Sequence, residues 1–200
     1  VERLVELLDQ LFPGKVGKVG QQFGILKVDV APGIEFDVSI PRTDSKTGTG
    51  HTGFVINSDP TMSVQEAARR RDFTWNALAA DILTGEVFDH YGGIQDLKDG
   101  VLRVTDPEKF DDDPLRVMRA VQFAARMDFK IEPESFKLMA DMVARGELSE
   151  LPPERITAEL EKLLLKAEKP SIGFEAAREL GIIEKHFAEL HNLTHLILYV

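Results

Sequence analysis

The second half of the chain is constrained by prolines that divide a helical pattern into runs of helix length. From about Asp106 onward, apolar residues recur at helical spacing, with breaks at Pro133, Pro152-Pro153, Pro170 and Gly181. Proline fits the first turn of a helix but disrupts its interior, so each proline indicates that a new helix begins. The pattern predicts four helices, over residues 113–127, 133–145, 153–167 and 170–180.

The opening residues mix helical and extended patterns. Residues 1–12 carry apolar side chains at helical spacing, and two β-rich runs, Phe23 to Val30 and Ile34 to Ile40, flank the turn pair Pro32-Gly33. Thr43 to Pro60 is rich in Gly, Ser, Thr and Asp, so a mobile loop is expected there.

A short capping signal follows this loop. Ser63 and Glu66 form a capping box, which predicts a short helix carrying Ala67 to Arg71. Residues 77–89 are typical of a hairpin that turns at Thr84-Gly85. The expected fold class is α+β, with a mixed α/β head over residues 1–100 and an all-α neck over residues 101–200.

The composition limits the classes of protein to which the chain can belong. It has 200 residues, 43% of them hydrophobic, with a net charge of −10 and no cysteine. No apolar stretch approaches the roughly 20 residues needed to cross a bilayer, so a soluble protein without a membrane partner is expected. The absence of cysteine fits a reducing compartment, and location in the cytoplasm is therefore expected. The negative net charge argues against holding nucleic acid by bulk electrostatics, although the arginines 69–71, 116, 119 and 126 are concentrated.

Two blocks place an aspartate beside arginines at the edge of a predicted helix. The first holds Arg71 and Asp72, and the second holds Asp113 and Arg116. Arginine can donate two hydrogen bonds to phosphate oxygens, and a carboxylate can accept from sugar hydroxyls or base amino groups. Asp113 is predicted to cap the helix that Pro114 begins, so it and Arg116 would share one helix end and could read a base edge. Alternatively, Asp113 only caps the helix and Arg116 only packs along the surface. If Arg116 reads the base, its replacement by alanine should reduce base discrimination more than stability, because a substitution at the surface near a helix start usually changes stability little.

A second set of carboxylates lies on a predicted strand. Glu35 and Asp37 are two residues apart, so both side chains should point to the same face. Paired carboxylates suit Mg²⁺, which keeps several of its waters. The alternative is a strand with one solvated face.

Four motifs, in order along the chain, resemble those of the class II tRNA nucleotidyltransferase and bacterial poly(A) polymerase family. The segments that carry the resemblance are Arg70-Arg71-Asp72-Phe73-Thr74-x-Asn76-Ala77, Asp89-x-x-Gly92-Gly93, Asp113-Pro114-Leu115-Arg116-Val117-x-Arg119-Ala120, and Glu154-Arg155-Ile156-x-x-Glu159-Leu160. The family's fold implies a nucleotidyltransferase-like head followed by a helical neck.

The resemblance also implies roles for individual residues. Asp37 matches a catalytic carboxylate that binds Mg²⁺. Glu35 has no firm counterpart in the family, and its assignment as a second metal ligand rests on its spacing from Asp37 along the strand. Arg71 would contact the triphosphate and Asp72 the ribose, while Asp113 and Arg116 would select the base. The motifs further place Asn76 and Arg119 in the nucleotide site, and Glu154 and Arg155 where they would brace the base-selecting helix.

Two elements of the family pattern do not occur in the sequence. In the family, a Gly-Gly-x-x-Arg-Asp segment and an Asp-x-Asp pair hold the triphosphate and the principal metal ligands, and neither occurs in residues 1–33. The expectation is that the sequence starts after both and stops near the neck, before the family's body and tail. These 200 residues alone are therefore expected to add nucleotides at no appreciable rate. His191 and His195 could form a metal pair on a helix, but no acidic partner lies at a useful spacing.

The resemblance implies addition of CCA to the 3′ ends of tRNA from CTP and ATP, with Mg²⁺ as cofactor. The motifs do not separate this activity from a poly(A) polymerase or from a partial CC- or A-adding enzyme. A non-catalytic nucleotide- or RNA-binding domain is the alternative from another class.

Overall fold

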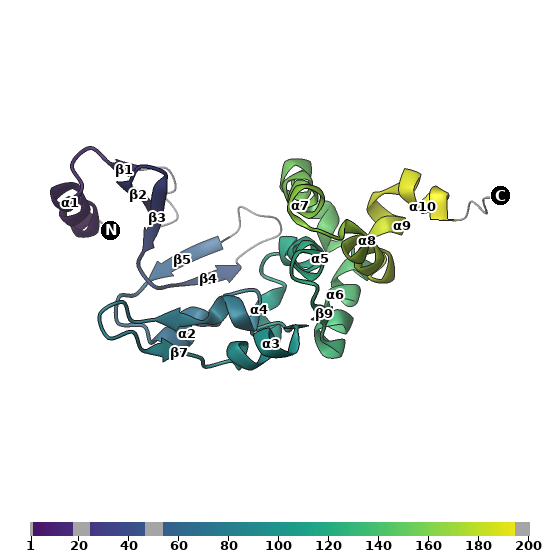
Figure 1. Ribbon diagram of the computed structural model, residues 1–200, viewed down its shortest axis with the longest axis horizontal. Coiled ribbons are helices and arrows are strands. Elements are labelled where there is room, and N and C mark those ends of the chain that lie inside the picture. Colours follow the sequence, from purple (N-terminus) through teal and green to yellow (C-terminus); the bar gives the residue numbers. More distant parts are fainter. Residues whose placement is uncertain (1, 18–24, 47–53, 195–200) are drawn as a thin grey trace. The chain divides into compact units, whose positions relative to one another are not determined.

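The computed structural model describes residues 2–17, 25–46 and 54–194 (Figure 1). The chain divides into two compact units, one formed by Val1–Thr47 with Phe54–Ala67 and the other by Gly48–Gly53 with Ala68–Val200. The content of helix and strand confirms the expected α+β class. No helix within the described ranges is both long and apolar enough to cross a membrane.

The first unit packs a helix against an antiparallel sheet. Its first elements are α1 (Glu2–Leu11), β1 (Val16–Gly17), β2 (Ile25–Ala31) and β3 (Ile34–Ser39), with sheet order β1-β2-β3. The predicted turn at Pro32-Gly33 joins β2 to β3, and Gly33 adopts the positive φ of 77° that such a turn needs. Leu8 of α1 is buried against Leu26 and Val28 of β2.

The segment expected to be a mobile loop contains a strand pair instead. β4 (Arg42–Lys46) and β5 (Phe54–Ser58) pair antiparallel, from Arg42 opposite Ser58 to Lys46 opposite Phe54. The expectation for Thr43 to Pro60 was therefore wrong over both strands, because backbone pairing between them overrides a composition typical of loops. Residues 47–53 lie outside the described part of the chain.

The predicted capping box is confirmed, but its helix ends early. Ser63 Oγ accepts from the backbone N–H of Glu66 at 3.1 Å, and α2 covers Val64–Ala68. The expectation of a helix through Arg71 was wrong. After Ala68 the chain turns, and backbone groups of Arg70 and Asp72 bond to Arg116 and Thr105 instead of continuing the helix.

The second unit begins with short elements that surround one extended segment. These are η2 (Thr74–Ala77), the hairpin strands β6 (Ala79–Ala80) and β7 (Val87–Phe88), α3 (Gly93–Asp99), and β8 (Val101–Leu102), which pairs in parallel with β9 (Lys130–Ile131). The hairpin over residues 77–89 is confirmed. The segment after β8 also bonds to residues 72–74, because Thr74 N donates to Arg103 O and Thr105 N donates to Asp72 O.

The rest of the second unit is helical. Its elements are α4 (Pro107–Phe110), α5 (Leu115–Met127), α6 (Pro133–Ala144), η3 (Glu147–Glu150), α7 (Pro153–Lys166), α8 (Pro170–Glu179), α9 (Ile182–His186) and α10 (Ala188–Thr194). All four predicted helices are confirmed to within two residues, as α5, α6, α7 and α8. α5 packs against both α7 and α8 (Figure 1), and its buried side chains include Val117, Met118 and Val121.

Candidate nucleotide-binding site

Asp72 is the centre of a polar cluster beside η2. The Asp72 side chain is only 8% exposed. Oδ1 accepts from the N–H of Phe73 and from Nδ2 of Asn76, both at 2.9 Å. The structure therefore joins Asp72 and Asn76, which the sequence predicted as parts of one site, and the bond fixes the orientation of both side chains.

Arg119 reaches the other oxygen of Asp72 from the middle of α5. Its Nε lies 2.7 Å and its Nη2 2.6 Å from Oδ2. The guanidinium also lies over the ring of Phe123, 5.1 Å from the ring centre. Trp75 meets the same ring edge-on at 4.9 Å. Ion pair and aromatic packing together lock Arg119 in one geometry.

Arg71 differs from its neighbours. Its backbone N–H donates to Ala68 O at 2.9 Å, but its side chain is exposed. Among the described residues the guanidinium has no hydrogen-bond or ion-pair partner. It is therefore available to an anionic ligand, as a triphosphate contact requires.

Asp113 lies two residues before α5. Its Oδ1 accepts from Leu115 N at 3.2 Å, but the helix begins at Leu115 with Pro114 at the N-cap position, so the prediction of Asp113 as N-cap and Pro114 as first helical residue was wrong by one residue. Arg155 of α7 donates to Asp113 Oδ2 at 3.0 Å. Asp113 keeps 34% of its side chain exposed, so its oxygens remain accessible. Glu154, beside Arg155, is exposed in the first turn of α7.

Arg116 is the second residue of α5, and its guanidinium contacts backbone carbonyls of the segments before the helix. Its Nη2 donates to Arg70 O at 2.6 Å, and its Nη1 donates to Lys109 O and, at 3.4 Å, to Phe110 O. The guanidinium thus holds α4 and the segment before Arg71 together. Arg116 therefore lies near Asp113 at the same end of α5, as predicted, but its donors bond to backbone carbonyls.

Glu35 and Asp37 share one face of β3, as predicted. Both carboxylates form ion pairs with Lys27 of β2, that of Asp37 at 3.5 Å. The hydrogen bond to Glu35 raises the pKa of Lys27, so the ammonium stays charged. Two exposed carboxylates on one face fit a Mg²⁺ ion that retains waters, provided that Lys27 moves aside. In the described ranges, no cluster of three or more Asp, Glu, His or Cys side chains could hold a metal. His195, one of the two histidines considered as a metal pair, lies outside the described residues.

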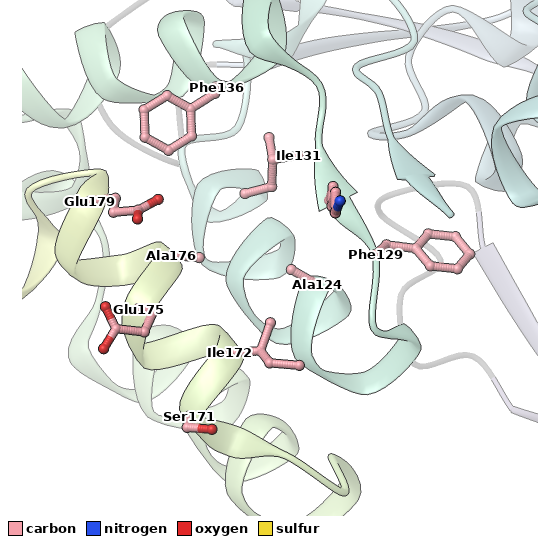
Figure 2. A pocket seen from close by; sticks show the side chains of 10 residues that line it. Ala124, Phe129, Ile131, Phe136, Ser171, Ile172, Glu175, Ala176 and Glu179 are labelled. Carbon is pink, nitrogen blue, oxygen red and sulfur yellow. The ribbon is translucent and has the colours of Figure 1, made fainter. Parts of the chain in front are cut away.

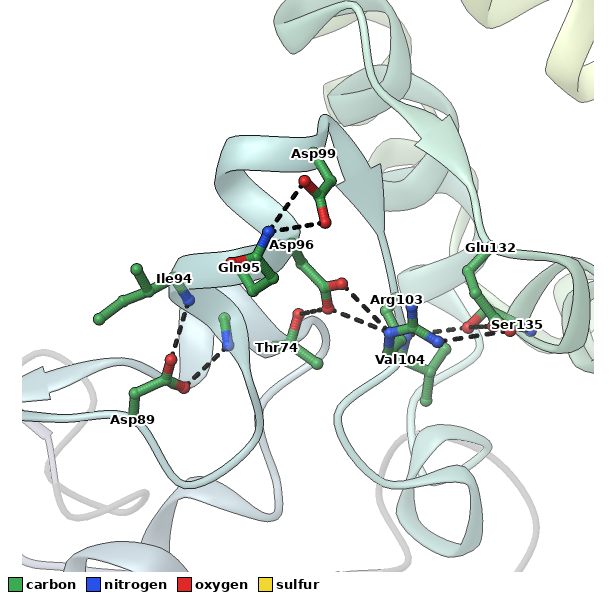
Figure 3. A network of polar contacts seen from close by, with 11 residues as sticks. Thr74, Asp89, Ile94, Gln95, Asp96, Asp99, Arg103, Val104, Glu132 and Ser135 are labelled. Atoms are coloured by element: carbon green, nitrogen blue, oxygen red, sulfur yellow. Dashed lines mark hydrogen bonds and ion pairs between the residues drawn. The ribbon is translucent and has the colours of Figure 1, made fainter.

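The motif at Asp89 caps a helix. Its oxygens accept from the backbone N–H groups of Gly93 at 2.8 Å and Ile94 at 3.0 Å, at the start of α3 (Figure 3). Burial raises the pKa of Asp89, but the backbone N–H groups of Ile94 and Gly93 are among those that outweigh it, and the net pKa lies below the ordinary value. Asp89 therefore fixes the direction in which α3 leaves the hairpin.

A polar network continues from α3 to α6. Thr74 Oγ1 donates to buried Asp96 at 2.7 Å, and Arg103 pairs with Asp96 at 3.1 Å and with Glu132 at 3.4 Å (Figure 3). Glu132 accepts from Ser135 at the start of α6. The sequence did not predict this network, because Asp96, Arg103 and Glu132 are charged residues of the kind usually found at the surface, and no motif links them. Only the fold brings them into contact.

An open pocket lies elsewhere in the helical unit, between α8 and β9 (Figure 2). It is lined by Ala124, Phe129, Lys130, Ile131, Phe136, Ser171, Ile172, Glu175, Ala176 and Glu179. None of the residues predicted for the nucleotide site contributes to this lining.

The sequence matches two known families along most of its length. Residues 1–103 match the family described as the poly A polymerase head domain, and residues 128–194 match the one described as a probable RNA and SrmB-binding site of polymerase A. The Multifunctional CCA protein of Xanthomonas campestris pv. campestris (strain B100) is 42% identical over 160 residues, which cover 78% of this chain and 38% of that protein.

Two solved structures share the fold. A CCA-adding enzyme in complex with ATP superposes with a TM-score of 0.74 at 28% identity, over 92% of this chain and 40% of that one. The Thermotoga maritima CCA-adding enzyme complexed with tRNA gives 0.71 at 29% identity, over 91% and 40%. The chain thus spans about two fifths of the length of these relatives. It belongs to the family of class II tRNA nucleotidyltransferases and bacterial poly(A) polymerases.

Proposed function

We propose that this chain is the nucleotide-selecting part of a tRNA nucleotidyltransferase that adds CCA to tRNA 3′ ends from CTP and ATP. One observation carries the proposal: Asp113, just before α5, and Arg116 and Arg119 of α5 lie within seven residues, and Arg119 joins this end of the helix to the Asp72 segment. The similarity to a Multifunctional CCA protein and to CCA-adding enzymes bound to ATP and to tRNA supports it.

The contacts of the first block suit binding of the sugar and phosphates. Asp72 would accept from the ribose, with Asn76 and Arg119 holding its carboxylate in place. Arg71, exposed beside it, would contact the triphosphate. The site would be largely formed before the nucleotide arrives, which lowers the entropic cost of binding.

The contacts of the second block suit recognition of the base. Asp113 would accept from a base amino group while Arg155 keeps its carboxylate oriented. Glu154, in the same turn of α7 as Arg155, would help to brace the base-selecting helix. Arg116 would exchange one backbone carbonyl for a base acceptor. A base lacking the matching group would leave Asp113 or Arg116 unpaired, which costs about 1–3 kcal/mol per lost contact.

Nucleotidyltransferases of this family generally use a divalent metal, and Glu35 and Asp37 would hold Mg²⁺ in this chain. These two carboxylates would hold the ion, which would supply positive charge to offset that of the phosphates in phosphoryl transfer. Residues 1–100 would act as the head and 101–200 as the neck. Location in the cytoplasm stays a prediction.

Calorimetry of the 200-residue chain with each of the four nucleoside triphosphates tests the proposal. CTP and ATP should bind, with little affinity for GTP or UTP, and Asp113→Asn should reduce this preference. Asp128→Asn is the matched control, because Asp128 is an exposed aspartate at the opposite end of α5. Equal binding of all four nucleotides would exclude base selection, and binding of ATP alone would favour a poly(A) polymerase.

A further inference from the structure

The backbone on both sides of Arg71 is fixed by residues from a distant part of the chain. Arg70 O accepts from Arg116, and Asp72 O accepts from the N–H of Thr105 at 3.1 Å. Arg71 itself sends an exposed side chain away from this anchored segment. Its position therefore depends on how firmly residues 69–72 are held.

A further anchor of this segment is an ion pair outside the motifs. Arg69 donates from both Nε and Nη2 to Asp106 Oδ2, each at 2.7 Å. The Asp106 side chain is only 12% exposed, so the pair is shielded from water on that side. Its other oxygen accepts from Glu108 N at 3.0 Å and caps α4. Asp106 thus ties the residue two before Arg71 to the start of α4.

We propose that Arg69 and Asp106 are positioning residues, whose ion pair sets the place of the Arg71 guanidinium for the triphosphate. The inference rests on the proposed function, in which Arg71 is the phosphate contact. Arg69 is not itself a phosphate ligand in this arrangement, because both of these donors are directed at Asp106.

The loss of the Asp106 charge has opposite expected effects on triphosphate binding under simple electrostatics and under the positioning role. Removing a negative charge near a site for an anion should strengthen binding of the triphosphate. Loss of the anchor should weaken it instead, because Arg71 would then be ordered only when the nucleotide binds. The sign of the change therefore separates the two explanations.

Asp106→Asn is the decisive variant, because asparagine caps helices as well as aspartate does, so the change keeps the cap and removes the carboxylate that Arg69 contacts with two donors. In calorimetry with the full 200-residue chain, we expect CTP affinity to fall roughly 2- to 30-fold. Affinity for CMP, which lacks the outer phosphates, should not change. Glu108→Gln is the control: it removes the same charge from α4, and with it only one contact to Arg69 Nη2, which is long at 3.5 Å and comes from a side chain that is 84% exposed. It should leave both affinities unchanged.

Three outcomes would overturn the inference. These are tighter CTP binding by Asp106→Asn, equal losses for CTP and CMP, which would indicate a general structural role, and an equal effect of Glu108→Gln. Arg71→Ala separates this inference from the proposed function. If Arg71→Ala lowers the CTP-to-CMP affinity ratio and Asp106→Asn does not, only the positioning role fails. If Arg71→Ala leaves the ratio unchanged, the assignment of Arg71 to the triphosphate fails, and the positioning role with it.

Discussion

Arg119 and Asp72, 47 residues apart in sequence, form a two-donor ion pair in which Nε and Nη2 of the guanidinium both contact one carboxylate oxygen, Oδ2. The pair joins the middle of α5 to the turn before η2. Because the opposite oxygen of Asp72 accepts from Phe73 N and Asn76, the carboxylate has partners on both sides.

Arg119→Ala should destabilise the fold strongly. Removing Arg119 leaves the buried carboxylate of Asp72 without its charged partner, and the expected loss in free energy of unfolding is about 3 kcal/mol. Arg178→Ala is the control, because its pair with Glu175 is exposed and such pairs contribute little. Urea denaturation of both variants measures the difference. Similar losses would show that the Arg119–Asp72 pair contributes no more than a surface pair.

Gly93→Ala should also destabilise, although alanine normally favours helices. A Cβ at Gly93 would lie 2.4 Å from Thr74 O, and a backbone atom cannot rotate away. Overpacking of this kind costs about 1–3 kcal/mol. Gly17→Ala, whose Cβ would meet Lys27 Cβ at an ordinary 3.5 Å, should change thermal stability far less. A stabilised Gly93→Ala protein would contradict the close approach of α3 to η2.

Arg116→Ala should reduce both base discrimination and stability. The sequence alone predicted a small effect on stability, but Arg116 bonds to three backbone carbonyls. Losing hydrogen bonds from a charged group is expected to cost about 1.5–3 kcal/mol. Denaturation and nucleotide titration of one preparation measure the two effects. A fall in stability with unchanged nucleotide preference would assign Arg116 a purely structural role.

Stability should fall as the pH drops below about 6.5, and His186 should contribute to that fall. Burial lowers the pKa of His186, and the charge of Lys185 lowers it further. The unfolded chain therefore takes up a proton at a higher pH than the folded chain does, which favours unfolding between the two pKa values. His186→Gln should weaken this pH dependence in denaturation at pH 7.5 and 5.5. His90→Gln, at an exposed position, serves as control and should not.

Lys27→Met should increase the affinity of the chain for Mg²⁺ or Mn²⁺. Its ammonium pairs with both Glu35 and Asp37, so it competes with any cation at these carboxylates. Adding Asp37→Asn to Lys27→Met should remove the gain. Titration of Mn²⁺ followed by electron paramagnetic resonance measures the bound ion. Unchanged affinity in Lys27→Met would argue against a metal at this pair.

The helices of the second unit were predictable because proline marks their starts locally. α6, α7 and α8 each begin at a proline, at Pro133, Pro153 and Pro170. The β4–β5 pair was not predictable in this way, because its residues have the composition of a loop and only long-range backbone pairing makes them strands.

The candidate site shows the same limit. Sequence motifs identified Asp72, Asp113 and Arg155, but not which partner each one has. The Asp113–Arg155 pair joins residues 42 apart, and the carbonyl contacts of Arg116 depend on how α4 packs. Such pairings arise only once the helices have packed, so residue types and spacing cannot reveal them.

The extended segment over residues 101–105 determines how the protein can be dissected. On one side it bonds to residues 72–74 and on the other to residues 130–132, through Thr74 N to Arg103 O and Glu132 N to Leu102 O. Fragments separated at residue 100 would each carry an unpaired edge, and Asp72 would be divided from Arg119. A fragment that begins at Ala68 would keep every one of these bonds, which makes it the better choice for producing the helical unit alone.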